Sequence, residues 1–170
     1  MAVPVAGQII RASDVLTFED AKPRCHAYDA ATVSCVSGTS TLITFDSEMY
    51  DSTGTMHTGG NPSRLIAPID GLYRYRSQII IAAVTTYTVG LFNVRQNAAG
   101  AAGGGTSLQN TNFVTAAAVT NVSPRTEFIR ALVAGDYLET FIQQTSGGSN
   151  RSTIAGAYST FATLEYVASS

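Results

Sequence analysis

The residues that could perform acid, base or metal chemistry are few and poorly placed for it. The chain has two histidines, His26 and His57, and neither belongs to a spacing typical of a metal site. Cys25, His26 and Cys35 could together offer three ligands to zinc, but adjacent residues of a strand point to opposite faces. A buried cysteine beside a solvent-facing histidine is the simpler interpretation. We therefore predict no metal.

Patterns for other chemistries are also missing from the sequence. There is no Gly-x-Ser-x-Gly elbow, and the glycine-rich stretch lacks the Gly-Lys-Ser/Thr of a phosphate-binding loop. Asp46 and Glu48, with Asp51 nearby, could be the carboxylate pair of a glycosidase. We favour a solvated or calcium-tolerant loop instead. Without a nucleophile or an acid/base arrangement, we predict no catalytic residues, no cofactor and no enzymatic activity.

The elements that must position these side chains are nearly all strands. β-branched and aromatic residues fill short segments, and Gly, Asn, Asp, Ser and Thr fill the gaps. Many short strands without intervening helices predict an antiparallel sandwich or barrel. We expect strands near residues 23–28, 33–36, 41–45, 64–67, 72–83, 87–95, 108–120, 125–133, 137–144 and 158–167.

Size and composition limit what the protein can be. A chain of 170 residues with 45% hydrophobic content can form one domain with one core. Charged residues make up 13% and the net charge is −2, which argues against nucleic-acid binding. No apolar run reaches the roughly 18 residues of a membrane helix, so we expect no membrane insertion. The N-terminus lacks the features of a secretion signal, so we expect the protein to be made in a cytoplasm. Cys25 and Cys35 leave two alternatives, free buried thiols or a disulfide.

The first 22 residues differ from the rest. MAVPVAGQIIR is apolar but contains Pro4 and Gly7, which predicts an extended arm, and residues 12–22 form the one helix candidate, with Ser13 as N-cap. We therefore divide the chain into an N-terminal docking arm, 1–22, and a head domain, 23–170. Within the head, residues 97–106 and 146–151 are rich in glycine and serine, and we expect mobile loops there.

The stretch APIDGLYRYR, residues 67–76, alternates with period two after a turn. The alternation sends Tyr73 and Tyr75 to one face of a strand and Arg74, Arg76 and Gln78 to the other. The tyrosine face suits a core. The arginine face needs water or a partner.

The region from Ile43 to Ile81 resembles the trimeric jelly-roll heads of the tumour-necrosis-factor and complement-recognition superfamily. Downstream, Leu132 to Gly148 is similar to that family's Leu-x-x-Gly-Asp strand pair, and Ser159 to Val167 is similar to its closing strand. The resemblance covers residues 23–168 and implies an all-β, ten-stranded antiparallel jelly-roll sandwich. The positions that carry it in the first region are Phe45, Asp46, Tyr50, Ser52 to Gly54, Arg64 to Ala67, Pro68, Gly71 and Tyr73.

This resemblance implies a homotrimer in which the second face of the central strand meets neighbouring subunits around a threefold axis. Charged groups excluded from water must be matched and hydrogen-bonded, so charges there would fix register and partner choice more than affinity. The alternative is a monomeric sandwich whose arginines face solvent. The candidate interface residues are Arg74, Arg76, Gln78, Glu127, Arg130 and Glu165.

The segment from Pro4 to Val15 is similar to the leader of many small tail proteins of bacteriophages. This implies a non-enzymatic virion structural protein of the tail tip or fibre region, assembled in the host cytoplasm, whose arm docks on other virion proteins. A capsid decoration protein anchored by the arm and a carbohydrate-binding module are the alternatives. Exposed loops could contact a host surface glycan, since aromatic faces and amides suit sugars. The candidate docking residues are Ile9, Ile10, Arg11 and Val15, and the candidate surface-contact residues are Tyr87, Asn97, Asn150, Arg151 and Tyr158.

Overall fold

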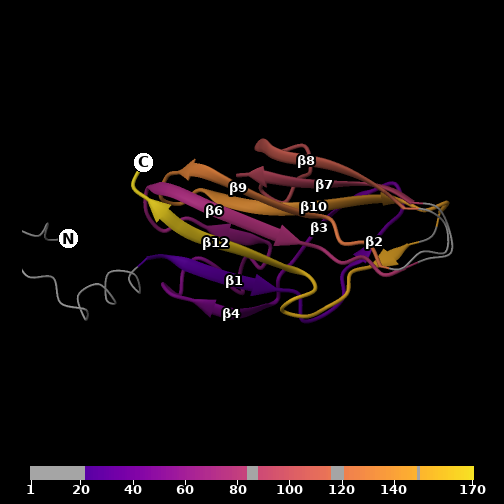
Figure 1. Cartoon of the computed structure of the whole chain (residues 1–170), viewed down its shortest axis with the longest axis horizontal. Helices are drawn as coiled ribbons and strands as arrows, with labels where there is room; N and C mark the ends of the chain where they lie inside the picture. The colour runs from indigo at the N-terminus through magenta and orange to yellow at the C-terminus, as the bar shows by residue number, and fades with distance from the viewer. Residues whose placement is uncertain (1–21, 84–87, 116–120, 149) are drawn as a thin grey trace, which may run out of the picture.

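The computed structural model describes residues 22–83, 88–115, 121–148 and 150–170 (Figure 1). These residues are all-β and form two layers of antiparallel strands, as a jelly-roll sandwich requires. The expected arm, residues 1–22, and its helix, residues 12–22, lie outside the described residues except for Lys22. No helix in the described part of the chain is long and apolar enough to span a membrane.

The first layer, which we name sheet I, has five strands. Its order is β4 (Ser47–Asp51), β1 (Arg24–Tyr28), β12 (Phe161–Ala168), β6 (Gly71–Gln78) and β9 (Arg125–Leu132). The central strand β6 pairs with β12 on one side and β9 on the other, so the arginines of β6 lie in the middle of a broad face.

The second layer, sheet II, packs across the core from sheet I. Its order is β3 (Ser40–Leu42), β10 (Tyr137–Thr145), β7 (Thr88–Gln96) and β8 (Thr106–Thr115), and β5 (Arg64–Ile66) also pairs with β10. A small third pair joins β2 (Ser34–Cys35) to β11 (Arg151–Ser152). All ten expected strands are present in the described residues, and β4 and β11 are additional.

The core lies between the inner faces of the two sheets. Tyr73 and Tyr75 are fully buried there, as the alternation predicts, and the Tyr75 hydroxyl hydrogen-bonds the Thr140 hydroxyl of sheet II. Glycine is required at position 71, where the Pro-x-Asp-Gly turn meets β6, because a Cβ there would lie 2.3 Å from the Tyr166 ring. Glycine therefore lets the start of β6 approach β12 closely.

Both cysteines are free and buried, which settles the two alternatives left by the sequence. Burial raises the pKa of the Cys25 thiol strongly, and it raises that of Cys35 to about 11. Both side chains therefore act as small, protonated core residues.

The glycine-rich connection from 97 to 105, part of the loop 97–106 that we expect to be mobile, is hydrogen-bonded to β10. The Ala99 amide donates to the Tyr137 hydroxyl at 3.1 Å, and the Gly100 amide donates to Glu139 Oε2 at 3.0 Å. Glu139 is buried and also pairs with Arg64 Nε at 3.1 Å. The buried Glu139 carboxylate thus gains a backbone N–H donor from this loop, and carboxylates favour such donors strongly.

The two ends of the sandwich differ in which loops they carry. β1 begins at the end where β12 stops, because Arg24 is the register partner of Glu165, and loop 97–105 lies at this same end (Figure 1). Loop 145–151 and the β2–β11 pair lie at the opposite end (Figure 1). The start of β1 therefore lies at the end away from loop 145–151.

Candidate functional site

The outer face of sheet I is the surface on which the predicted interface residues gather. Arg74, Arg76 and Gln78 point outward from β6, opposite the buried Tyr73 and Tyr75. The register places Glu165 of β12 beside Arg74, and Glu127 of β9 beside Arg76. Four of the predicted interface residues, from three strands, therefore lie together on one face: Arg74, Arg76, Glu127 and Glu165.

These four residues form a continuous row of ion pairs within one subunit. Glu127 lies between two arginines, with Oε1 3.6 Å from Arg74 Nε and Oε2 3.1 Å from Arg76 Nε. Arg74 Nη1 also lies 4.0 Å from Glu165 Oε2. All four side chains are between 33% and 53% exposed, so each pair alone adds little stability. Their main effect is to hold the charges in fixed positions.

The remaining two interface candidates take no part in the ion-pair row, although Gln78 lies on the same face. Arg130 is the register partner of Tyr73, whose side chain faces the core. The Arg130 side chain therefore points to the opposite face of sheet I from that of Glu127, and it is exposed because β9 is an edge strand. Gln78 donates through Nε2 to the carbonyl oxygens of Tyr158 and Ser159, at 3.1 and 3.2 Å. The structure therefore separates both from the ion-pair row.

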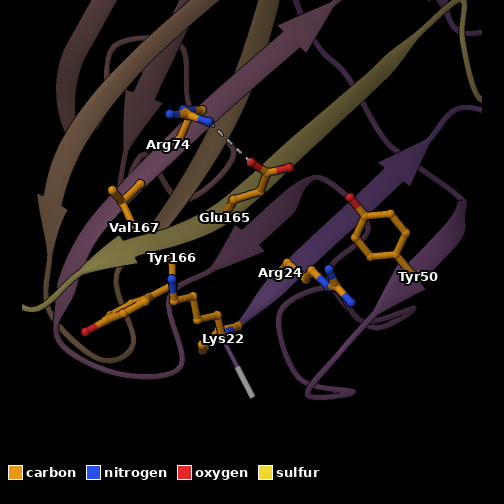
Figure 2. Close-up of a pocket in the computed structure, with 8 residues that line it drawn as sticks. Lys22, Arg24, Tyr50, Arg74, Glu165, Tyr166 and Val167 are labelled. Atoms are coloured by element: carbon orange, nitrogen blue, oxygen red, sulfur yellow. Dashed lines mark ion pairs between the residues drawn. The ribbon is translucent and has the colours of Figure 1, made fainter. Parts of the chain in front are cut away.

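Two pockets open on this face. The first, which we name the Arg24 pocket, has a volume of about 340 Å³. Figure 2 shows the Arg74–Glu165 ion pair at one side of it and Arg24 close to Tyr50 at the other. It is lined by Lys22, Pro23, Arg24, Tyr50, Arg74, Glu165, Tyr166 and Val167.

The second pocket, the Arg125 pocket, has a volume of about 410 Å³ and lies between the start of β9 and the end of β6. Phe161 of β12 supplies an aromatic wall. Within the described residues no ion pair involves Arg125, which is exposed. The pocket is lined by Arg76, Ser77, Gln78, Arg125, Thr126, Glu127 and Phe161.

An aromatic cluster lies on β1 of the same face. The His26 ring stacks on Phe161 with centroids 5.1 Å apart and meets Tyr50 edge-on at 5.9 Å. His26 Nε2 lies 2.9 Å from the carbonyl oxygen of Ala157, to which it can donate. His26 is therefore a packed residue of the outer face, pointing away from Cys25 as the strand alternation requires.

Asp46 and Asp51 accept backbone hydrogen bonds that stabilise the fold. Asp51 Oδ1 accepts from the amides of Thr53 and Gly54, both at 2.9 Å, and Oδ2 accepts from those of Met56 and His57, at 2.7 and 3.0 Å. Burial tends to raise the Asp51 pKa, but the donors outweigh it and lower the pKa below its ordinary value of 3.8. The carboxylate organises the turn that follows β4.

A metal ion at this place fits the chemistry poorly. Cys25, Glu48 and Asp51 each offer a ligand atom within 4.8 Å of the others. However, both Asp51 oxygens already accept backbone hydrogen bonds, and the raised pKa of the Cys25 thiol keeps it protonated. Asp46 accepts instead from the Ala30 amide at 2.6 Å.

The surface-contact candidates divide between the two ends of the sandwich. Asn97 lies at the end from which β1 starts, and its amide is engaged by Asp136 and the Tyr137 backbone at 2.7 and 3.0 Å. Asn97 itself is exposed, whereas Arg151 is only 3% exposed, so burial removes Arg151 alone from the set of surface contacts. Asn150 is exposed and Tyr158 is 76% exposed. Tyr87 and the docking candidates Ile9, Ile10, Arg11 and Val15 lie outside the described residues.

Sequence reasoning missed β4 and the edge that it forms. Met49 and Tyr50 are 46% and 39% exposed there, and Tyr50 lines the Arg24 pocket. The strand shows no alternation, because its middle three residues are all exposed. The one available signal was the Asp-Ser-Thr-Gly turn that begins at Asp51 and ends the strand.

Comparison with known proteins identifies the fold. No protein-family model matches the chain, and no curated protein matches it in sequence. Among solved structures the chain is similar to Eiger TNF from S. frugiperda, with 14% identity, a TM-score of 0.59, and coverage of 88% of this chain and 94% of that one. It is also similar to murine APRIL, with 14% identity, a TM-score of 0.62, and coverage of 86% and 99%.

A third likeness extends the set beyond those two proteins. The globular domain of zebrafish complement 1qA protein matches with 9% identity, a TM-score of 0.54, and coverage of 88% of this chain and 99% of that one. The described chain therefore has the jelly-roll fold of the tumour-necrosis-factor and complement globular heads.

Proposed function

We propose that this protein is a homotrimeric, non-enzymatic structural head of a bacteriophage virion, placed at the tail tip or fibre region. The jelly roll, together with the exposed outer face of its sheet I, is the observation that supports a trimeric head. In the trimer this face turns toward the threefold axis and is covered by neighbouring subunits.

The composition of the outer face supports burial against another subunit. Tyr50, Ile129 and Val167 are 39%, 54% and 37% exposed on it. Exposed apolar groups beside a fixed charged row are typical of an interface that combines apolar contact with electrostatic selection of the partner. A monomer would leave these groups in water.

The positions of the segments at the two ends of the sandwich support anchoring at one end and contact at the other. Lys22, which joins the expected arm to the head, lies beside the start of β1, and Asn150 and Tyr158 lie toward the opposite end of the sandwich. The similarity of residues 4–15 to phage tail leaders supports a virion component as the anchor. The free end then faces outward, where a host surface glycan is the expected partner.

A charge reversal tests the interface. Arg74→Glu would place three carboxylates in one row, because Arg74 now neutralises both Glu127 and Glu165. We expect monomers in sedimentation velocity, whereas Asn110→Glu, on the exposed edge strand of sheet II, should remain trimeric. A trimer that survives Arg74→Glu would reject this face as the interface.

Particle association tests the virion role. Full-length protein should co-sediment with purified phage particles from the genome that encodes it, and protein lacking residues 1–22 should remain in the supernatant while still trimeric. Equal recovery of both forms with particles would show that residues 1–22 are not needed for binding to the particle. Absence of the full-length protein from particles would contradict the virion role.

A further inference from the structure

The Arg125 pocket contains a cation that no carboxylate neutralises. In the ion-pair row two arginines are matched by two glutamates, so the row carries no net charge. Arg125 lies beside this row, is exposed, and forms no ion pair within the described residues. The pocket therefore offers one guanidinium group to a ligand that carries a negative charge.

The register places this pocket in the last row of the β6 ladders. Gln78, at the end of β6, pairs with Phe161 on one side and with Arg125 on the other, and all three residues line the pocket. β12 begins where β1 ends, so this row lies toward the end of the sandwich that carries loop 145–151 (Figure 1). The pocket is thus near the end at which we propose contact with the host.

Aromatic rings border the same pocket. Phe161 forms one wall, and the volume of about 410 Å³ lies in the usual range of small-molecule sites, about 300–1,000 Å³. Gln78 Nε2 donates to the carbonyl oxygens of Tyr158 and Ser159, so the loop that carries the Tyr158 ring adjoins the pocket. That ring is 76% exposed. Aromatic faces of this kind suit the apolar face of a sugar ring.

We propose that the Arg125 pocket binds a hexuronic acid, a sugar with a carboxylate on its ring, from a host surface polysaccharide. This inference rests on the proposed function and gives the chemical class of its glycan partner. The Arg125 guanidinium donates two parallel hydrogen bonds to the sugar carboxylate, whose geometry matches it. The sugar ring lies against Phe161. The Gln78 amide oxygen can accept from a sugar hydroxyl, because the loop holds only its nitrogen.

The pocket and the apolar part of the outer face occupy different ends of sheet I. Ile129 is the register partner of Arg74, and Val167 lies beyond Glu165 at the end of β12, so both are displaced from the Gln78 row toward the start of β1. In a trimer that closes over these apolar residues, the pocket lies at the outward rim of the covered face. A sugar can then enter it from the free end.

Matched sugars test the recognition of the carboxylate. The methyl glycosides of glucuronic, galacturonic and mannuronic acid are each titrated into the full chain beside the neutral glucoside, galactoside and mannoside, with binding followed by NMR. At least one acidic sugar should bind, and its neutral counterpart should bind about ten- to a hundredfold more weakly, since the bond to a charged group is lost. Acetate, which has the charge without the ring, should also bind more weakly.

A matched pair of variants tests the residue. Arg125→Gln should weaken binding of the acidic sugar about ten- to a hundredfold and leave the melting temperature unchanged, because the side chain is exposed. Arg130→Gln is the control. Arg130 lies on the same strand, is also exposed and forms no ion pair in the described part of the chain, but it points to the other face of sheet I. Its variant should bind as the wild type does.

Three results would overturn the inference: no acidic sugar binds, the neutral sugar or acetate binds as tightly as the acidic sugar, or Arg125→Gln binds as the wild type does. A protein that is trimeric and bound to particles but gives one of these results loses only this inference. A protein that is absent from particles yet binds the acidic sugar through Arg125 keeps the pocket assignment, and the virion role is then wrong.

Discussion

Asp51 should stabilise the fold more than any other exposed acidic residue near β4, and Asp51→Asn measures how much. The carboxylate accepts backbone N–H groups on both oxygens, from Thr53 and Gly54 on one and from Met56 and His57 on the other. Whichever way an asparagine amide turns, two N–H groups face an NH2 group that cannot accept. The Thr53 and Gly54 N–H groups are exposed, whereas those of Met56 and His57 are partly buried, so the asparagine oxygen should keep the second pair. The loss is then that of two exposed hydrogen bonds to a charged acceptor, about 1–3 kcal/mol.

The pH dependence of this loss follows from the Asp51 pKa, which lies below 3.8 in the folded protein. A lowered pKa means that the charged group stabilises the fold above the unfolded-state pKa, and that this stability disappears as the pH falls through the folded-state pKa. The difference between wild type and Asp51→Asn should therefore be largest near neutral pH and shrink below pH 3.8.

Urea unfolding of both proteins at one fixed concentration, at several pH values, measures this difference, since assembly makes apparent stability depend on concentration. Asp70→Asn is the matched control, because Asp70 is exposed and accepts one backbone hydrogen bond, from Ala134 at 2.8 Å. It should lose about 1 kcal/mol or less. Equal stability of Asp51→Asn and wild type at neutral pH would refute the reasoning, as would a difference that does not change with pH.

Three further substitutions or reactions test the packing. Gly71→Ala should lower the melting temperature, by about 1–3 kcal/mol in stability, because its Cβ would lie 2.3 Å from the Tyr166 ring; an unchanged melting temperature would contradict that contact. Ala99→Gly should raise stability by up to about 1 kcal/mol, because Ala99 has a φ of 53°, which favours glycine; a less stable variant in thermal unfolding would argue against it. Cys25 and Cys35 should react with Ellman's reagent at pH 8 only after unfolding, because burial raises the pKa of both thiols; fast reaction of the folded protein would show that they are accessible.

The sequence predicted the centre of sheet I well because local alternation is enough to define it. Period two in β6 separates buried tyrosines from outward arginines, and the strand partners of β6 were recognisable from their apolar residues. Even the parity difference between Glu127 and Arg130 is contained in their spacing of three residues. The four residues of the ion-pair row could therefore be predicted from the sequence. Arg130 was included among the interface candidates although its spacing from Glu127 places it on the other face.

The edges and loops were less predictable because tertiary contacts decide them. β4 has three consecutive exposed residues and exists as a strand only through its pairing with β1. The burial of Arg151 and the fastening of Asn97 depend on segments distant in sequence, and neither is visible in a local window. The unpaired position of Met49 in β4 follows from a bulge, which no pattern in the sequence indicates.

The molar mass of the protein in solution, measured by light scattering for the full chain and for a form lacking residues 1–22, tests the central claim most directly. Our account predicts that the full chain has three times its 17.8 kDa chain mass and that the shortened form is also a trimer, because sheet I and not the arm holds the subunits together. A monomer in both cases, at concentrations where the heads should assemble, would contradict the account and leave a solitary jelly roll whose outer face is open to other partners.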